Sequence, residues 1–120
     1  MPEVAERSTV EVLKAARERI SDPERWTRNQ YARSETRLHT EPNSPDAVGW
    51  CANGSILAEV DAGAFFELGN DSPGVDAADL LIRASGGRPT STINDRDGHA
   101  AVMALYDRAI QLAEQEAADA

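Results

Sequence analysis

The sequence of 120 residues contains one cysteine, Cys51, and no cluster of cysteines and histidines with the spacing of a zinc site. A single thiol excludes an internal disulfide. We therefore expect neither a disulfide-stabilised scaffold nor a metal centre. The N-terminal residues show no apolar stretch typical of a secretory signal, so the expected compartment is the reducing cytoplasm.

Aromatic residues make up only 5% of the chain, and long hydrophobic runs are missing. No run reaches the roughly 20 apolar residues that a membrane-spanning helix requires, so we expect no segment within a membrane. Hydrophobic residues still amount to 41%, which is enough for a packed core. That core must consist of leucine, isoleucine, valine and alanine, which suits helices packed at close range.

Lysine is nearly absent, because Lys14 is the one lysine among twelve basic residues, and the net charge is −9. Residues 1–40 contain eight basic and seven acidic side chains, whereas residues 41–120 contain four and fourteen. An acidic surface repels phosphate backbones, which disfavours general nucleic-acid binding. The arginines of the first third could form a local basic patch, but they alternate with acidic residues, which favours a salt-bridged surface. A nucleic-acid regulator acting through these arginines is the weakest hypothesis.

Helical periodicity is the main signal that the sequence does contain. Ser8-Thr-Val-Glu11 matches a capping box, and apolar residues then recur every three or four positions, which predicts a helix over 9–20. Further patterns predict a helix over 75–85, closed by Gly86-Gly87, and a last helix over 98–116. Residues 22–49 are irregular, and a short β-hairpin is an option in the loop 27–42.

The helix that contains Cys51 has two alternative starts. It begins either at Ser44, followed by Pro45 at the first helical position, or near Gly49-Trp50. The first start places Cys51 in mid-helix on an apolar stripe, where its thiol would be buried and inert. The second places it in the first turn, where the helix dipole would favour the thiolate.

Together these patterns predict a mainly α-helical fold, a single-domain bundle of four to five helices. The domain would cover residues 1–120, with an ordered core over about 8–116 and flexible termini.

A cysteine nucleophile needs a base and an orienting group, and His99 with Asn94 or Asp95 could supply them to Cys51. The order Asn94 before His99 differs from the papain-like order of cysteine, histidine, asparagine. Buried cysteines and histidines that merely pack in a core are far more common than catalytic ones. We therefore favour the structural interpretation of both side chains.

The segment Asn94-Asp-Arg-Asp-Gly98 superficially resembles a calcium-binding loop. With Gly98 as its sixth position, the first and twelfth positions would be Ile93 and Ala104, whose side chains offer no oxygen ligand. The segment is therefore not expected to bind calcium. Capping of the last helix by Asp95 or Asp97 is the better interpretation. No nucleotide-binding or hydrolase motif is present, and we expect no cofactor.

Several short motifs resemble an uncharacterised family of small bacterial and phage proteins, common in actinobacteria. They are Trp26, Ala32-Arg33, the run Pro45 to Ile56 containing Trp50-Cys51-Ala-Asn-Gly54, and Ile93-Asn94-Asp95. Members of that family pair a Trp-Cys-x-x-Gly segment with a later Trp-Asn-Asp, where this chain has Ile93. The resemblance spans about 9–113. It implies a shared helical fold in which Trp50-Cys51 packs near Asn94-Asp95, and it implies no known activity.

These observations favour a small cytoplasmic binding or interaction protein without catalytic activity. Its expected partner is another protein, a second copy of the chain or a small ligand, and the candidate binding residues are Trp26, Trp50 and Arg33. The alternative is a cysteine-dependent enzyme that uses Cys51 with His99 and Asn94 or Asp95.

Overall fold

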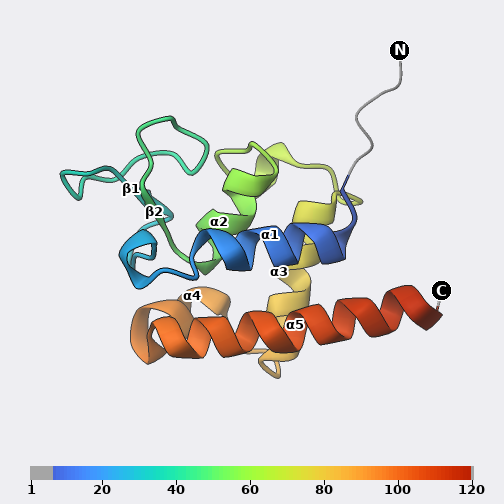
Figure 1. The fold of residues 1–120 in the computed structure, drawn as a ribbon. Helices are drawn as coiled ribbons and strands as arrows, with labels where there is room; N and C mark the ends of the chain where they lie inside the picture. Colours follow the sequence, from blue (N-terminus) through green and yellow to red (C-terminus); the bar gives the residue numbers. More distant parts are fainter. Residues whose placement is uncertain (1–6, 120) are drawn as a thin grey trace, which may run out of the picture.

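The computed structural model describes residues 7–119, which form five α-helices, short 3₁₀- and π-helical segments and one two-stranded sheet (Figure 1). The predicted mainly α-helical, single-domain fold is confirmed. The outermost parts of the predicted flexible termini, residues 1–6 and 120, lie outside the described residues.

Helix α1 (Thr9–Arg19) begins as its sequence predicts. The Ser8 hydroxyl accepts a hydrogen bond from the Glu11 amide at 3.1 Å, and the Glu11 carboxylate accepts one from the Ser8 amide at 2.9 Å. This capping box satisfies two of the backbone donors that a helix N-terminus leaves free.

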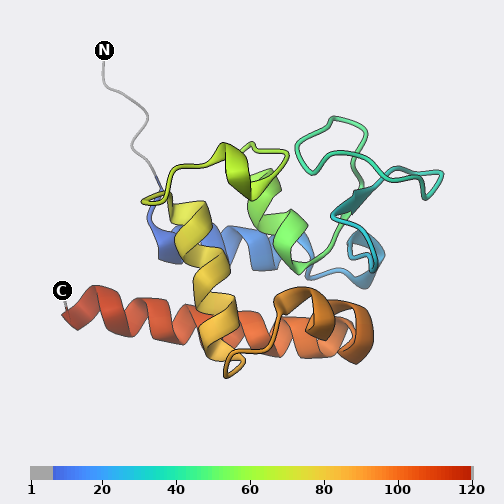
Figure 2. The ribbon, with the colours of Figure 1, turned by 180° about the vertical axis from the view of Figure 1, so that it is seen from behind.

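Three helices form the main core. Helix α1 lies beside α5 (His99–Asp119) with the opposite chain direction, and α3 (Pro73–Ala84) crosses them behind in Figure 1 and in front in Figure 2. The fully buried side chains include Leu13, Leu81, Leu105 and Tyr106. Tyr106 donates its hydroxyl proton to the Ala52 carbonyl at 2.6 Å, so its polar tip is satisfied inside the core.

The ion pairs of α1 connect it to other helices. Arg17 pairs with Asp107 of α5 at 2.7 Å, and Arg19 pairs with Glu59 at the same distance. These two arginines are thus salt-bridged, as the sequence predicts, but their partners lie in α5 and at the end of α2 and not among the acidic residues of the first third.

Helix α2 (Ala52–Glu59) follows directly after strand β2 (Gly49–Trp50), which pairs antiparallel with strand β1 (Ala32–Arg33). The predicted hairpin is thus present, but its second strand lies beyond the loop 27–42. Within that loop a single bridge joins Arg33 and His39. Two further 3₁₀ turns, η1 (Pro23–Arg25) and η2 (Phe65–Glu67), complete the connections.

The segment between α3 and α5 contains a single-turn helix α4 (Thr90–Thr92) and a π-helical turn η3 (Ile93–Asp97). Gly86 and Gly87 end α3 with φ of 78° and 99°, as predicted. The predicted capping of α5 by Asp95 or Asp97 is wrong. Gly98 precedes α5 with φ of 95°, a conformation that favours glycine, and the Asp97 carboxylate pairs with Arg88 at 3.0 Å.

Candidate functional site

Asn94 joins three separate segments of the chain. Its side-chain oxygen accepts hydrogen bonds from Trp26 Nε1 at 2.7 Å and from the Ala52 amide at 2.9 Å. Its side-chain nitrogen donates to the Thr27 carbonyl at 3.0 Å and to Asp95 Oδ1 at 2.9 Å. A carboxamide offers two donors and two acceptor lone pairs, so all four are used. With a side chain that is only 1% exposed, Asn94 retains no hydrogen-bonding capacity for a substrate.

Cys51 is the N-cap residue of α2, and its sulfur accepts a hydrogen bond from the Gly54 amide at 3.2 Å. The helix therefore starts near the second of the two predicted positions, yet the thiol is buried, as the first alternative implied. Burial raises the pKa of the Cys51 thiol to about 11 and outweighs the backbone hydrogen bonds that lower it. At neutral pH the group is a thiol and not a thiolate.

Gly54 explains the spacing of the Trp-Cys-x-x-Gly segment. A Cβ atom at this position would lie 1.9 Å from the Tyr31 carbonyl oxygen, so only glycine lets α2 approach the loop this closely. That same carbonyl accepts a hydrogen bond from the Cys51 amide at 3.1 Å. Trp50 completes the arrangement, because its indole nitrogen donates to the Pro42 carbonyl at 2.9 Å.

These contacts define the Cys51 junction, which we take to be Trp26, Trp50, Cys51, Gly54 and Asn94. The implied proximity of Trp50-Cys51 to Asn94-Asp95 is present in the structure: the Asn94 side chain binds the amide that follows Cys51.

The structure brings Cys51, Asn94 and Asp95 together at one surface hollow of about 450 Å³. His39, and not His99, is the histidine among the residues that line it. The His99 ring instead donates from Nε2 to the Ile20 carbonyl at 2.7 Å and packs edge-on against Trp26, with ring centroids 5.6 Å apart. The proposed base of the cysteine-enzyme hypothesis is thus engaged elsewhere.

The remaining binding candidates differ in their availability. Trp26 belongs to the Cys51 junction, and the Arg28 guanidinium lies 5.0 Å from the centroid of its ring. The Arg33 guanidinium donates to the Glu24 carbonyl at 2.6 Å and to the Ser34 carbonyl at 3.3 Å. Two of its donors therefore bind backbone carbonyls of the loop and are not available to a ligand. Trp50 also faces a second hollow.

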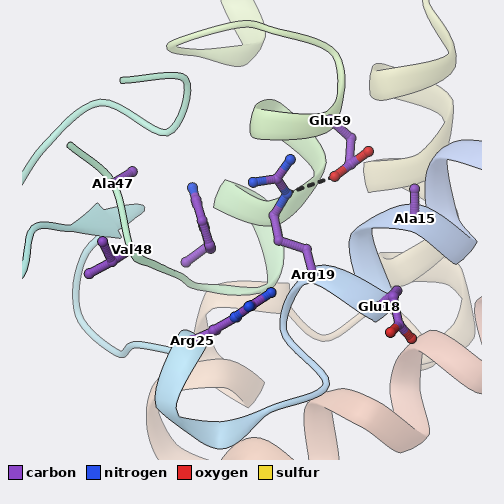
Figure 3. Close-up of a pocket in the computed structure, with 8 residues that line it drawn as sticks. Ala15, Glu18, Arg19, Arg25, Ala47, Val48 and Glu59 are labelled. Atoms are coloured by element: carbon purple, nitrogen blue, oxygen red, sulfur yellow. Dashed lines mark hydrogen bonds and ion pairs between the residues drawn. The ribbon is translucent and has the colours of Figure 1, made fainter. Parts of the chain in front are cut away.

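That second hollow, the Arg19 cleft, lies between α1, η1, β2 and the end of α2 and has a volume of about 550 Å³ (Figure 3). Its lining combines apolar and charged side chains: Ala15, Glu18, Arg19, Arg25, Ala47, Val48, Trp50 and Glu59. This grouping could not be predicted from the sequence, because Arg19 and Glu59 are far apart in the chain and neither belongs to a motif.

Arg19 is held in place from two sides. Its Nε donates to Glu59 at 2.7 Å, and its guanidinium carbon lies 4.6 Å from the centroid of the Trp50 ring. Glu59 is only 12% exposed and also pairs with Arg7. Burial alone would raise the pKa of Glu59, but the hydrogen bonds and charges of Arg7 and Arg19 together lower it. Glu59 is therefore a stable anion that fixes Arg19.

Both Nη groups of Arg19 make no hydrogen bond to any residue in the range 7–119, and Arg25 has no ion pair within the same range. Figure 3 shows the Arg25 side chain extending from η1 into the hollow beside Arg19, while the Glu18 carboxylate points away from the Arg19 guanidinium. The cleft thus presents guanidinium donors that the described part of the chain does not use.

Two other features that would point to a function are absent from the part of the chain that the structure describes. Over 7–119, no group of three or more histidine, cysteine, aspartate or glutamate side chains is arranged to hold a metal ion. In the same part of the chain, no helix has both the length and the apolar character needed to cross a membrane.

No curated protein and no solved structure matches the chain. One family model does match, over residues 5–112, and it describes a family of unknown function (DUF6197). The expectation that the chain belongs to a family without a known function is thereby confirmed. The match covers most of the chain, including the Cys51 junction and the Arg19 cleft, and the chain therefore belongs to the family of unknown function DUF6197.

Proposed function

We propose that the protein is a non-catalytic binding protein and that its ligand or partner occupies the Arg19 cleft. The observation that carries the proposal is the fixed Arg19 guanidinium, whose Nη donors face a preformed hollow and make no hydrogen bond to residues 7–119. Binding sites on proteins are commonly preformed hollows with a few well-placed polar groups. Fixing the guanidinium in advance lowers the entropic cost of binding.

The groups that a cysteine enzyme would need support the non-catalytic interpretation. The Cys51 thiol is buried with a raised pKa, Asn94 has no free hydrogen-bonding atom, and His99 donates to a backbone carbonyl. The cysteine-dependent enzyme remains the alternative hypothesis, since Cys51, Asn94 and Asp95 share one hollow. It requires that Cys51→Ala abolish the cellular activity of the protein.

The proposal places the protein in the cytoplasm of a bacterial or phage-infected cell, a setting suited to its free, buried cysteine. A protein partner or a second copy of the chain could present the group that enters the cleft.

The proposal is tested by recording amide and indole chemical shifts of the ¹⁵N-labelled protein against a panel of small carboxylates, amines and neutral aromatics. We expect at least one class to shift the signals of Ala47, Val48 and the Trp50 indole. In Arg25→Ala these shifts should shrink, whereas in Arg96→Ala, a control at an exposed arginine outside the cleft, they should persist. Shifts confined to other surfaces, or none at millimolar ligand, would refute the proposal.

A further inference from the structure

We infer that the Arg19 cleft takes an organic carboxylate carried on an apolar body, supplied either by a small molecule or by the C-terminus of a peptide. This inference rests on the proposed function and adds the chemical class of the ligand. It follows from the donors of the cleft, from its local charge and from its apolar walls.

The donor set of the cleft matches a carboxylate. Arg19 binds Glu59 through Nε, and both of its Nη groups make no hydrogen bond to the described residues 7–119. The second guanidinium, that of Arg25, lines the same hollow. A guanidinium binds the two oxygens of a carboxylate in a forked geometry, and such charged hydrogen bonds are about twice as strong as neutral ones. Two guanidinium groups beside one hollow therefore favour a planar anion over a neutral or cationic group.

The local charge favours a ligand with a single negative charge. The lining of the cleft contains two arginines, Arg19 and Arg25, and two carboxylates, those of Glu18 and Glu59. Glu59 is already paired with Arg7 and Arg19, and the Glu18 carboxylate points away from the Arg19 guanidinium (Figure 3), so the Arg25 guanidinium supplies one positive charge for a ligand. The whole chain carries a net charge of −9. Multiply charged anions are repelled more strongly by this acidic molecule than a monoanion is.

The walls of the cleft favour an apolar body behind the carboxylate. Ala15 and Ala47 line it together with Val48, which is 37% exposed and therefore offers free apolar surface. A volume of about 550 Å³ lies within the range of roughly 300–1,000 Å³ that is typical of small-molecule sites.

The test compares matched ligands that differ only in the charged group. Indole-3-acetate is titrated against its neutral amide, and an acetylated tetrapeptide ending in phenylalanine is titrated with a free or an amidated C-terminus. The readout is the shift of the Val48 and Trp50 signals. We expect at least one carboxylate to bind about tenfold more tightly than its amide. The stronger of the two carboxylates identifies the source.

Two variants test whether the Arg25 guanidinium itself binds the carboxylate or whether loss of any positive charge has the same effect. We expect Arg25→Ala to lower the affinity for the preferred carboxylate about tenfold and to leave the affinity for its amide unchanged. Arg96→Ala should change neither affinity. Arg25 is exposed, so unchanged circular dichroism should confirm that its variant folds.

The outcomes distinguish the inference from the proposed function. If the amides bind in the cleft as tightly as the carboxylates, the carboxylate class is wrong while the binding function stands. If only amines or neutral aromatics of the wider panel bind in the cleft, the carboxylate class is likewise wrong. If no carboxylate, amide, amine or neutral aromatic shifts the cleft signals, both are wrong.

Discussion

The Asn94 side chain makes four hydrogen bonds inside the protein. Its carboxamide binds Trp26, Thr27, Ala52 and Asp95, and therefore ties the loop, the start of α2 and η3 to one point. Its loss would leave the buried Ala52 amide and the Thr27 carbonyl without their partner. A buried polar group without a partner costs about 1–3 kcal/mol.

We therefore expect Asn94→Ala to lower the free energy of unfolding by about 2–4 kcal/mol, measured by urea denaturation. Asn53→Ala is the matched control, because the Asn53 side chain makes no hydrogen bond to any residue within 7–119. It should change the free energy by less than about 1 kcal/mol. Equal effects of the two substitutions would contradict the role given to Asn94.

Asn94 and Cys51 also show what could be predicted for single residues. Both stand out in the sequence, because an Asn-Asp pair and a lone cysteine are visible there. Their roles were not predictable, since the four partners of Asn94 come from positions 26, 27, 52 and 95. The burial of Cys51 at a helix start likewise depends on a loop that is distant in sequence.

At the scale of elements, α2 depends on the absence of a side chain at Gly54. Alanine favours a helix over glycine by about 1 kcal/mol, so Gly54→Ala would stabilise an isolated α2. In the folded protein the added methyl group would lie 1.9 Å from the Tyr31 oxygen, and a steric conflict with backbone cannot be relieved by a side-chain rotation.

We expect the steric conflict with the Tyr31 oxygen to outweigh the higher helix propensity of alanine. Gly54→Ala should then lower the free energy of unfolding by about 1–3 kcal/mol, measured by thermal or urea unfolding. Gly69→Ala serves as the comparison, since no atom lies within 4 Å of the position where its Cβ would stand. A Gly54→Ala protein that is as stable as Gly69→Ala would show that α2 and the loop are not packed as described.

Elements with local signals could be predicted from the sequence. The capping box of α1, the glycines that end α3 and the periodicity of α5 all act within a few residues. The start of α2 could not be chosen, because it is set by the pairing of Gly49–Trp50 with Ala32–Arg33. The π-helical turn that turns Asn94 inward had no local signal, and the Arg19 cleft combines residues from four segments.

At the scale of the whole molecule, the irregular segment 26–50 is bound to the helices as part of one structure. Trp26 binds Asn94, and the Trp50 strand continues into α2. Tryptophan fluorescence reports on this segment, whereas far-ultraviolet circular dichroism reports on the helices.

We expect the two signals to follow one coincident transition in urea, as in a two-state domain. Fluorescence that changes at lower urea concentration than circular dichroism would mean that the loop unfolds independently of the helical core. Asn94→Ala should move both midpoints together, because the hydrogen bonds of Asn94 connect the two parts.

The role of Cys51 in a structural junction is tested most directly by its rate of alkylation with iodoacetamide from pH 7 to 11. The thiolate is the reacting form, and a pKa of about 11 in place of 9.0 lowers its fraction at neutral pH about a hundredfold. We expect the native protein to react at least a hundredfold more slowly than the urea-unfolded protein, with a rate that still rises toward pH 11. A native rate equal to the unfolded one, with a midpoint below about pH 8.5, would show an activated thiol and contradict the structural role.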